Sequence, residues 1–295
     1  MDVWRAKAAL VAVLRCRVSP DRMSNLDVTS IARELMTAYE TGAMLPAPLS
    51  SRPGFNLDTA YAVENTLKCW REESGHKSAG RKVGYANKAM WRILKLDTLV
   101  WGHMYDDTVH QTSGNSGNLH IVHPRSLKIE PEIMFGMKEA IASPISDAAA
   151  ALAAVDWIAL GFEIIDCPYP DWKFQPGDFV ASFGLHAGLV VGERVPIKPD
   201  RIPALVEELS RFKLRMMKGG ELVEEGSAKN CLRSPALCLA ELGSAIVRRF
   251  PDEPLTKNEI VSSGTLTAGH LTQAGDRWTA ELEGLSLPPV TLELT

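Results

Sequence analysis

Hydrophobic residues recur at spacings of three and four in two stretches near the start of the chain, residues 25–42 and 57–75. This spacing places them on one face of an α-helix, so both stretches are predicted to be helices. Thr29 or Ser30 offers a side-chain cap at the start of the first helix. The segment between the helices, residues 45–55, contains three prolines and is predicted to be an extended linker.

Strand-like patterns become more frequent after the second helix. The pattern predicts strands at residues 80–84, 127–137, 157–165, 185–192, 260–266, 277–283 and 290–294, and helices at residues 87–96, 147–154, 202–211 and 235–250. A hairpin is expected around Gly219 and Gly220. These elements indicate the α+β class. We expect a small helical part at residues 23–100 and a catalytic mixed-β domain at residues 101–295.

The first 22 residues carry five basic side chains around a short apolar run. They could be a targeting segment, but no small-residue cleavage site follows and Asp2 stands where a secretory signal is basic. We favour an N-terminal extension, residues 1–22, ahead of a second start at Met23. We expect this extension to be disordered, so that a chain beginning at Met23 keeps the melting temperature of the full chain.

Composition narrows the classes of partner. The chain of 295 residues has a net charge of −4 and a pI near 6.0, which gives no electrostatic reason to expect nucleic-acid binding. No run of 18 apolar residues predicts a membrane span. The five cysteines form no CxxC pair, which favours a reducing, cytoplasmic setting.

Glu130 and Glu132 carry the first sign of chemistry, because they lie in the predicted strand 127–137. Side chains alternate along a strand, so both carboxylates face the same way. Two adjacent carboxylates repel each other and resist loss of water. Taken alone, this pair is most simply a solvated strand edge.

Glu163 changes this interpretation. It lies in the middle of the apolar strand 157–165, which is predicted to be buried on both faces. A buried carboxylate without a partner costs several kcal/mol or becomes neutral. A cation is a suitable partner, and three carboxylates completed by water suit Mg²⁺ or Mn²⁺ better than zinc.

Lys82 lies in the short glycine-bounded strand Gly80-Arg-Lys-Val-Gly84, so its ammonium is expected to face a pocket. A surface lysine is the plain alternative. A buried lysine beside a metal could transfer a proton or neutralise a carboxylate.

Five motifs in order make the chain resemble a known family. They are Pro53-Gly-Phe-Asn-Leu-Asp-Thr-Ala-Tyr61, Gly80-Arg-Lys-Val-Gly84, Lys128-Ile-Glu-Pro-Glu-Ile133, Gly161-Phe-Glu-Ile-Ile-Asp166 with Asp171-Trp172, and Ser263-Gly-Thr-Leu-Thr267. Together they resemble the 2-keto-4-pentenoate hydratase and 4-oxalocrotonate decarboxylase family, within the fumarylacetoacetate hydrolase superfamily. The resemblance covers residues 24–295.

The resemblance implies specific roles. It implies a metal site at Glu130, Glu132 and Glu163, and a catalytic lysine at Lys82. It also implies a C-terminal mixed β-roll after the helical part, and assembly into homo-oligomers. A further set of residues is implied to line the pocket for the substrate carboxylate on one strand: Ser263, Thr265 and Thr267.

Two departures from the family pattern concern proton-handling groups. Where relatives carry Pro-Asp-Phe-Gly this chain has Leu99-Val-Trp-Gly102, so Val100 replaces an aspartate. Where relatives carry Asp-Asn-Ala-Ser it has Ser182-Phe-Gly-Leu185, followed by His186. We keep Ser182 as a substrate contact. His186 and Asp106, which follows His103 closely, are our candidates for the missing acid–base work, although each could be structural.

The predicted function is therefore a divalent-metal-dependent lyase or hydratase acting on a small 2-keto, or 2-hydroxy-enoate, carboxylic acid through a metal-stabilised enolate. C–C hydrolysis is our second choice of reaction. The rival hypothesis is a catalytically inactive family member that serves as a ligand-binding or oligomeric structural module. The loss of the two acidic stretches favours the rival, and retention of the three glutamates and Lys82 opposes it.

Overall fold

Two helices open the described part of the chain, residues 26–295 of a computed structural model. They are α2 (Val28–Thr41) and α3 (Leu57–Glu73), and both confirm the periodicity of the sequence. The cap of α2 is neither Thr29 nor Ser30 but Asp27, whose side chain accepts a hydrogen bond from the Ser30 amide at 3.1 Å. The predicted extension, residues 1–22, lies outside the described residues.

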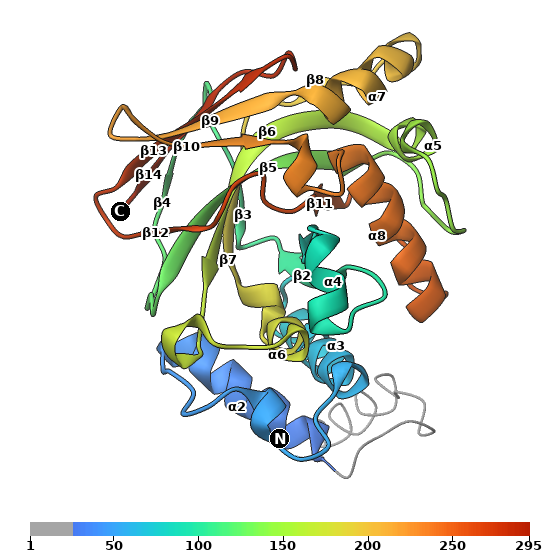
Figure 1. Ribbon diagram of the computed structural model, residues 1–295. Helices are drawn as coiled ribbons and strands as arrows, with labels where there is room; N and C mark the ends of the chain where they lie inside the picture. Colours follow the sequence, from blue (N-terminus) through green and yellow to red (C-terminus); the bar gives the residue numbers. More distant parts are fainter. Residues whose placement is uncertain (1–25) are drawn as a thin grey trace.

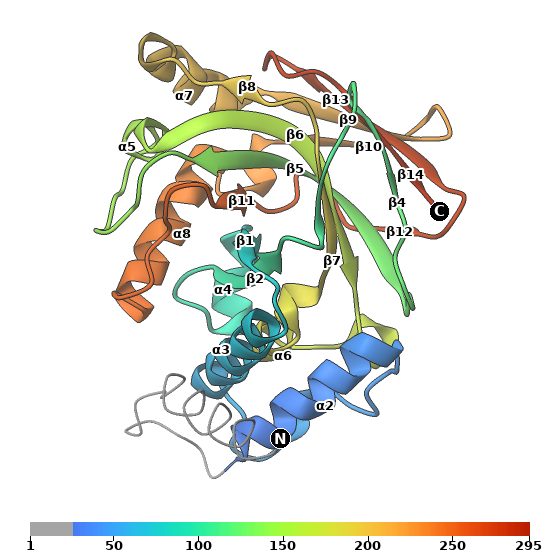
Figure 2. The same ribbon diagram turned by 180° about the vertical axis from the view of Figure 1, so that it is seen from behind.

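A nine-stranded mixed sheet forms the centre of the molecule. Its strands follow the order β2-β1-β11-β5-β6-β7-β3, with β12 paired to β5 and β8 paired to β6. They are β1 (Ser78–Gly84), β2 (Val100–Tyr105), β3 (Val109–Gln111), β5 (Leu127–Met137), β6 (Val155–Asp166), β7 (His186–Val191), β8 (Val195–Pro196), β11 (Ile260–Ser262) and β12 (His270–Thr272). The long strands β5 and β6 curl strongly, as Figures 1 and 2 show.

A second sheet of five strands, in the order β10-β9-β13-β14-β4, lies across the upper part of Figure 1. Its members are β4 (Ser116–Leu119), β9 (Lys213–Lys218), β10 (Glu221–Ser227), β13 (Arg277–Glu283) and β14 (Val290–Leu294). β9 and β10 form the hairpin predicted around Gly219 and Gly220. The curled sheets and the helical N-terminal part form the α+β arrangement that the sequence predicts.

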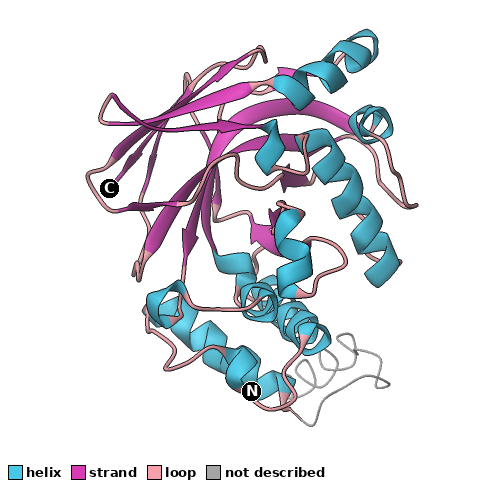
Figure 3. Cartoon of the chain, in the orientation of Figure 1, coloured by secondary structure: helices cyan, strands magenta, loops and turns pink. Residues whose placement is uncertain are grey.

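The remaining helices cover the sheet edges and the end near α2 (Figure 3). They are α4 (Ala89–Leu94), α5 (Ala148–Ala153), α6 (Pro176–Ala181), α7 (Ile202–Arg211) and α8 (Pro235–Arg249). α6 packs on α3, and α5 packs on α8. No helix among residues 26–295 is both long enough and apolar enough to cross a membrane.

The structure differs from the sequence prediction in several places, and three of these differences lie close to the site or to the boundary between the two predicted parts. β1 lies in the predicted helical part, yet it pairs with β11 and β2 inside the large sheet. β11 stops at Ser262, four residues before the predicted end at Leu266, because Gly264 turns the chain with a left-handed φ of 98°. The helix α6 was not predicted, since six residues are too few for a periodic pattern.

Candidate metal centre

Three glutamates meet where β5 and β6 pair. In this antiparallel ladder Glu130 lies directly opposite Glu163, and Glu132 follows on the same face two residues later. One carboxylate oxygen from each of the three lies within 4.8 Å of the others. The structure therefore brings together the residues for which the sequence predicts a metal-binding role.

Glu132 is held by the strand beside it. Its Oε2 accepts hydrogen bonds from the Ser262 hydroxyl and from the Gly264 amide, the latter at 2.8 Å. Its Oε1 is buried and has no hydrogen-bond partner among the described residues. The residue is 0% exposed, so this oxygen is an unsatisfied acceptor in the interior. A cation shared with the other two carboxylates would satisfy it.

Burial and mutual repulsion disfavour ionisation of this cluster. Burial raises the pKa of Glu130 to about 7, Lys82 opposes the rise, and the charge of Glu163 adds to it. Burial, followed by the charges of Glu163 and Glu130, raises the pKa of Glu132 well above its usual range. The donors are all carboxylate oxygens, the ligands that Mg²⁺ and Mn²⁺ prefer. The cluster fits a hard divalent cation.

Lys82 reaches the same cluster from β1. Its Nζ lies 2.9 Å from Glu163 Oε2, donates to the Gly184 carbonyl at 2.9 Å, and is 4.7 Å from the centre of the Phe179 ring. The side chain is buried. Gly184 is required here: its φ is 62°, and a Cβ at this position would lie 2.7 Å from Lys82 Cδ.

His186 lies behind Glu163. Its Nδ1 is 2.9 Å from Glu163 Oε1, and its Nε2 is 3.0 Å from the hydroxyl oxygen of Thr108. The carboxylate of Glu163 is thus held by Lys82 through one oxygen and by His186 through the other. This arrangement indicates that His186 orients Glu163, in the way that outer residues orient metal ligands.

Changing His186 to glutamine is expected to weaken Mn²⁺ binding about 10- to 100-fold, because Glu163 loses the partner that fixes its orientation. The matched control is His103→Gln. His103 is equally buried and contacts a different glutamate, Glu64, at 2.5 Å. Calorimetric titration should find the metal affinity changed only in His186→Gln. Equal losses in both variants would show that the effect is general destabilisation.

A cavity of about 530 Å³ opens beside the cluster. Among the residues predicted for the site, Lys82, Glu130, Thr265 and Thr267 line it. Thr265 and Thr267 lie in the loop after β11 rather than on the predicted strand.

The other predicted pocket residues lie elsewhere in the structure. Ser263 is buried in the same loop and does not line the cavity. Ser182 bonds to the hydroxyl of Tyr169 at 2.6 Å, and neither it nor His186 lines the cavity. The structure does not bring these three side chains to the cavity wall.

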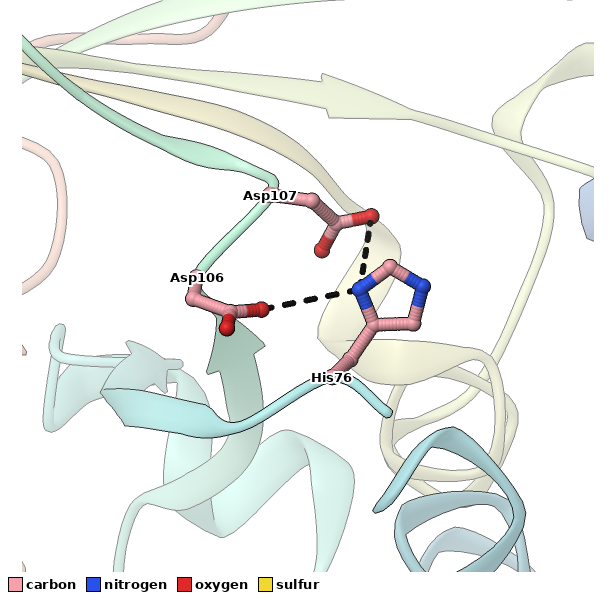
Figure 4. A group of neighbouring side chains, drawn as sticks. All are labelled: His76, Asp106 and Asp107. Carbon is pink, nitrogen blue, oxygen red and sulfur yellow. Dashed lines mark ion pairs between the residues drawn. The ribbon is translucent and has the colours of Figure 1, made fainter. Parts of the chain in front are cut away.

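Asp106 lies at a separate surface cluster, which Figure 4 shows. The Nδ1 of His76 is 3.5 Å from a carboxylate oxygen of Asp106 and 3.5 Å from one of Asp107. These three side chains could also hold a metal, but both aspartates are exposed and Asp107 already pairs with Arg71 at 2.5 Å. In the glutamate cluster, by contrast, Glu132 and Glu163 are buried and Glu130 is half-buried, so it is the better candidate for a metal site.

Sequence reasoning missed four groups at the centre: Thr108, Phe179, Ser262 and the Gly184 carbonyl. A strand prediction that reached Ser262 offered a weak signal for that residue, because it precedes the recognised Ser-Gly-Thr motif. Thr108 and Gly184 lie in irregular backbone, and Phe179 lies in the six-residue helix α6, so periodicity gives no information on any of the three.

The chain is similar to curated bacterial enzymes along most of its length, although no protein-family profile matches it. It is 27% identical over 260 residues to a 4-oxalocrotonate decarboxylase of Pseudomonas sp., covering 88% of this chain and 96% of the relative. It is 28% identical over 243 residues to the 2-hydroxyhexa-2,4-dienoate hydratase of Comamonas testosteroni, covering 81% and 88%. The 2-keto-4-pentenoate hydratase of Paraburkholderia xenovorans is 25% identical over 254 residues, covering 86% and 90%.

Comparison with solved structures agrees with the sequence comparison. The 4-oxalocrotonate decarboxylase of Pseudomonas putida G7, solved with magnesium and adipate, has a TM-score of 0.81 at 23% identity and covers 92% of this chain and 99% of its own. The chain is a homologue of these hydratases and decarboxylases. A fumarylpyruvate hydrolase of Pseudomonas aeruginosa, solved with Mn²⁺ and pyruvate, has a TM-score of 0.52 at 15% identity and covers 73% and 88%. Its likeness to this chain is one of fold, and together with the decarboxylase it confirms the predicted fumarylacetoacetate hydrolase type of fold.

The structure places Val100, which stands where the family pattern has an aspartate. Val100 begins β2, pairs with Gly84 and is buried. It is not among the residues that line the cavity beside the glutamates. The aspartate expected at this position is therefore replaced by an apolar strand residue.

Proposed function

We propose that the chain is a divalent-metal-dependent enzyme of the hydratase and decarboxylase type that acts on a small 2-keto, or 2-hydroxy-enoate, carboxylic acid. The observation that carries the proposal is the unsatisfied, fully buried Oε1 of Glu132 beside two further carboxylates and Lys82. A protein that used this fold only as a structural module would have no need to keep such a costly cluster in its interior.

Glu130, Glu132 and Glu163 would hold Mg²⁺ or Mn²⁺. The bound cation would supply Lewis-acid chemistry, lowering the energy of negative charge on the keto oxygen of the substrate. The three glutamates can provide three negative charges, which would hold a divalent cation even though the ammonium of Lys82 competes for Glu163. The proposal includes both metals, because carboxylate oxygens are suitable ligands for Mg²⁺ and for Mn²⁺.

Lys82 is the residue best placed to handle a proton. Its ammonium is fixed by Glu163 and the Gly184 carbonyl at 2.9 Å each, and it lines the cavity. It can donate a proton to a carbon centre or neutralise charge that develops there. Thr265 and Thr267, on the facing loop, supply polar contacts for the substrate carboxylate.

Hydration and decarboxylation are the first choice of reaction, because the similar enzymes named above are hydratases and decarboxylases. C–C hydrolysis is the second choice. All three reactions pass through an enolate of a 2-keto acid. We also propose a cytoplasmic homo-oligomer.

The test is a turnover assay on a panel of 2-keto and 2-hydroxy-dienoate acids with added Mg²⁺ or Mn²⁺. The ultraviolet absorbance of the enol or dienol reports the progress of each reaction. We expect activity that depends on the metal and is removed by EDTA. A protein that retains a metal but turns over none of the panel would favour the ligand-binding module.

A further inference from the structure

Glu224 is a carboxylate in the cavity wall that the proposed function does not use. It lies on β10 and lines the cavity together with Lys82 and Glu130. Its two carboxylate oxygens accept hydrogen bonds from the Ala268 amide at 3.2 and 3.3 Å, and its Oε2 is 2.5 Å from Nε2 of His270. The side chain is 30% exposed, so it can exchange protons with solvent.

The backbone of β10 directs Glu224 to this wall. The pairing of β10 with β9 changes register between Leu222 and Glu224, an irregularity of the kind that redirects side chains beside active sites. Gly226, two residues further on, faces the loop after β11, because a Cβ there would lie 2.3 Å from the Leu266 carbonyl oxygen. Residues two apart on a strand share a face, so Glu224 faces the same loop.

The other titratable side chains in the cavity wall are unsuited to accept a proton. Lys82 and Lys128 are ammonium groups. Burial raises the pKa of Tyr85, so its hydroxyl stays protonated at neutral pH. Glu130 belongs to the metal cluster. Among the described residues that line the cavity, Glu224 is therefore the one carboxylate outside that cluster.

A divalent cation on the three glutamates leaves Glu224 free to act as a base. The cation and the ammonium of Lys82, which contacts the cluster at 2.9 Å, together balance the charges of the three carboxylates. Glu224 is not part of this balance, since its ion-pair partner among residues 26–295 is His270. Protonation of Glu224 therefore removes no ligand from the metal.

We propose that Glu224 is a catalytic base for the addition of water to a carbon–carbon double bond of the substrate. The inference rests on the proposed function, which places the keto acid head group at the glutamates. It supplies a proton acceptor in a chain that carries the buried Val100 where the family pattern has an aspartate. The two candidates from the sequence, His186 and Asp106, do not line the cavity.

Addition of water requires one proton to be removed and one to be supplied. Glu224 takes a proton from a water molecule while the oxygen of that water bonds to the double-bond carbon farther from the keto group. The π electron pair moves toward the keto oxygen and gives an enolate. Lys82 then donates a proton to the carbon next to the keto group, which restores the ketone. Solvent takes the proton from Glu224 and returns one to Lys82, so the net change is one added water.

Two rates measured on the full chain loaded with Mg²⁺ separate Glu224 from the head-group site. The first is hydration of 2-hydroxypenta-2,4-dienoate, which is followed by the loss of its ultraviolet absorbance. The second is exchange of the protons next to the keto group of 2-oxopentanoate in deuterated water, which is followed by NMR. This exchange passes through an enolate but adds no water, so it reports on Lys82 and the metal alone.

Glu224→Gln should lower the hydration rate by about 10²-fold or more, the usual contribution of a positioned base, and leave proton exchange near the wild-type rate. Glutamine keeps an oxygen that accepts from the Ala268 amide but cannot take a proton. Glu225→Gln is the matched control, because Glu225 is the next residue on β10, is exposed and does not line the cavity. It should leave both rates near those of the wild type. Calorimetric titration should find the Mg²⁺ affinity unchanged in both variants, and melting curves check that each is folded.

Several results would overturn the inference. A Glu224→Gln protein that hydrates within about tenfold of the wild-type rate shows that Glu224 is not the base. Equal loss of both rates, or a loss of Mg²⁺ affinity, assigns Glu224 to the integrity of the site instead. A wild type that exchanges protons but hydrates nothing refutes the inference and leaves the proposed function with decarboxylation as its reaction. If the wild type shows neither reaction, the proposed function fails together with the inference.

Discussion

Replacing Glu132 with glutamine is expected to abolish stabilisation of the fold by Mn²⁺ or Mg²⁺ and, at the same time, to make the metal-free protein more stable. The wild-type protein buries this carboxyl group at 0% exposure beside two other carboxylates. Glutamine has nearly the same shape and carries no charge, so repulsion and the cost of burying a charge disappear. Its neutral amide is a much poorer metal ligand.

The free energy of unfolding of the metal-free protein is expected to fall as the pH rises. Glu130 and Glu132 have raised pKa values in the folded state, so the folded protein binds more protons than the unfolded one. Stability from these groups is fully present below the unfolded pKa, 4.5, and is lost as the pH rises through about 7 for Glu130. We therefore expect the metal-free wild type to lose stability between about pH 5 and 8, and Glu132→Gln to lose less.

Denaturant unfolding measures these effects when it is carried out at about pH 5 and about pH 8, with EDTA and with excess Mn²⁺ at each pH. At 100 times its Kd, Mn²⁺ should stabilise the wild type by about 2.7 kcal/mol and the variant hardly at all. Glu64→Gln is the matched control: Glu64 is a buried glutamate paired with His103, away from the cluster. It should lower stability and keep the response to Mn²⁺. A Glu132→Gln protein that responds to Mn²⁺ like the wild type would contradict the assignment.

Replacing Lys82 with methionine is expected to lower turnover by about 10²- to 10⁴-fold, the usual contribution of a positioned acid or base. Methionine fills a similar volume but cannot transfer a proton. Metal affinity should be kept or increased, because the ammonium 2.9 Å from Glu163 no longer competes for that carboxylate. Loss of turnover with retained metal is the distinguishing result.

Lys128→Met is the matched control for Lys82→Met. Lys128 also lines the cavity, but its ammonium lies over Trp172 and makes no ion pair with a carboxylate among the described residues. Its replacement should reduce turnover by less than about tenfold, below the contribution of an acid or base. Comparable losses in the two variants would mean that Lys82 acts through the charge of the cavity rather than as a specific proton donor.

The three glutamates could be predicted because they lie on long strands with strong patterns. β5 matches the predicted range 127–137, and β6 extends the predicted range 157–165 by a few residues. Alternation fixed the relative direction of Glu130 and Glu132, and the apolar run made the charge of Glu163 conspicuous. Lys82 was found in the same way, between two glycines of a short strand.

The surroundings of the cluster could not be predicted, because they depend on irregular backbone. His186, which contacts Glu163, follows three residues with left-handed φ values, Phe183, Gly184 and Leu185, and such values are uncommon for Phe and Leu. Thr108 reaches His186 from a turn before β3, a strand of three residues. Asp106 was predicted from its nearness in sequence to His103, but the strand end directs it to His76 at the surface.

A crystal of the full chain soaked in Mn²⁺ and measured at a wavelength where manganese scatters anomalously tests the central claim most directly. The account predicts one strong anomalous peak, about 2.0–2.3 Å from a carboxylate oxygen of each of Glu130, Glu132 and Glu163. A peak only at His76, Asp106 and Asp107, or no peak among the three glutamates at saturating Mn²⁺, would contradict it.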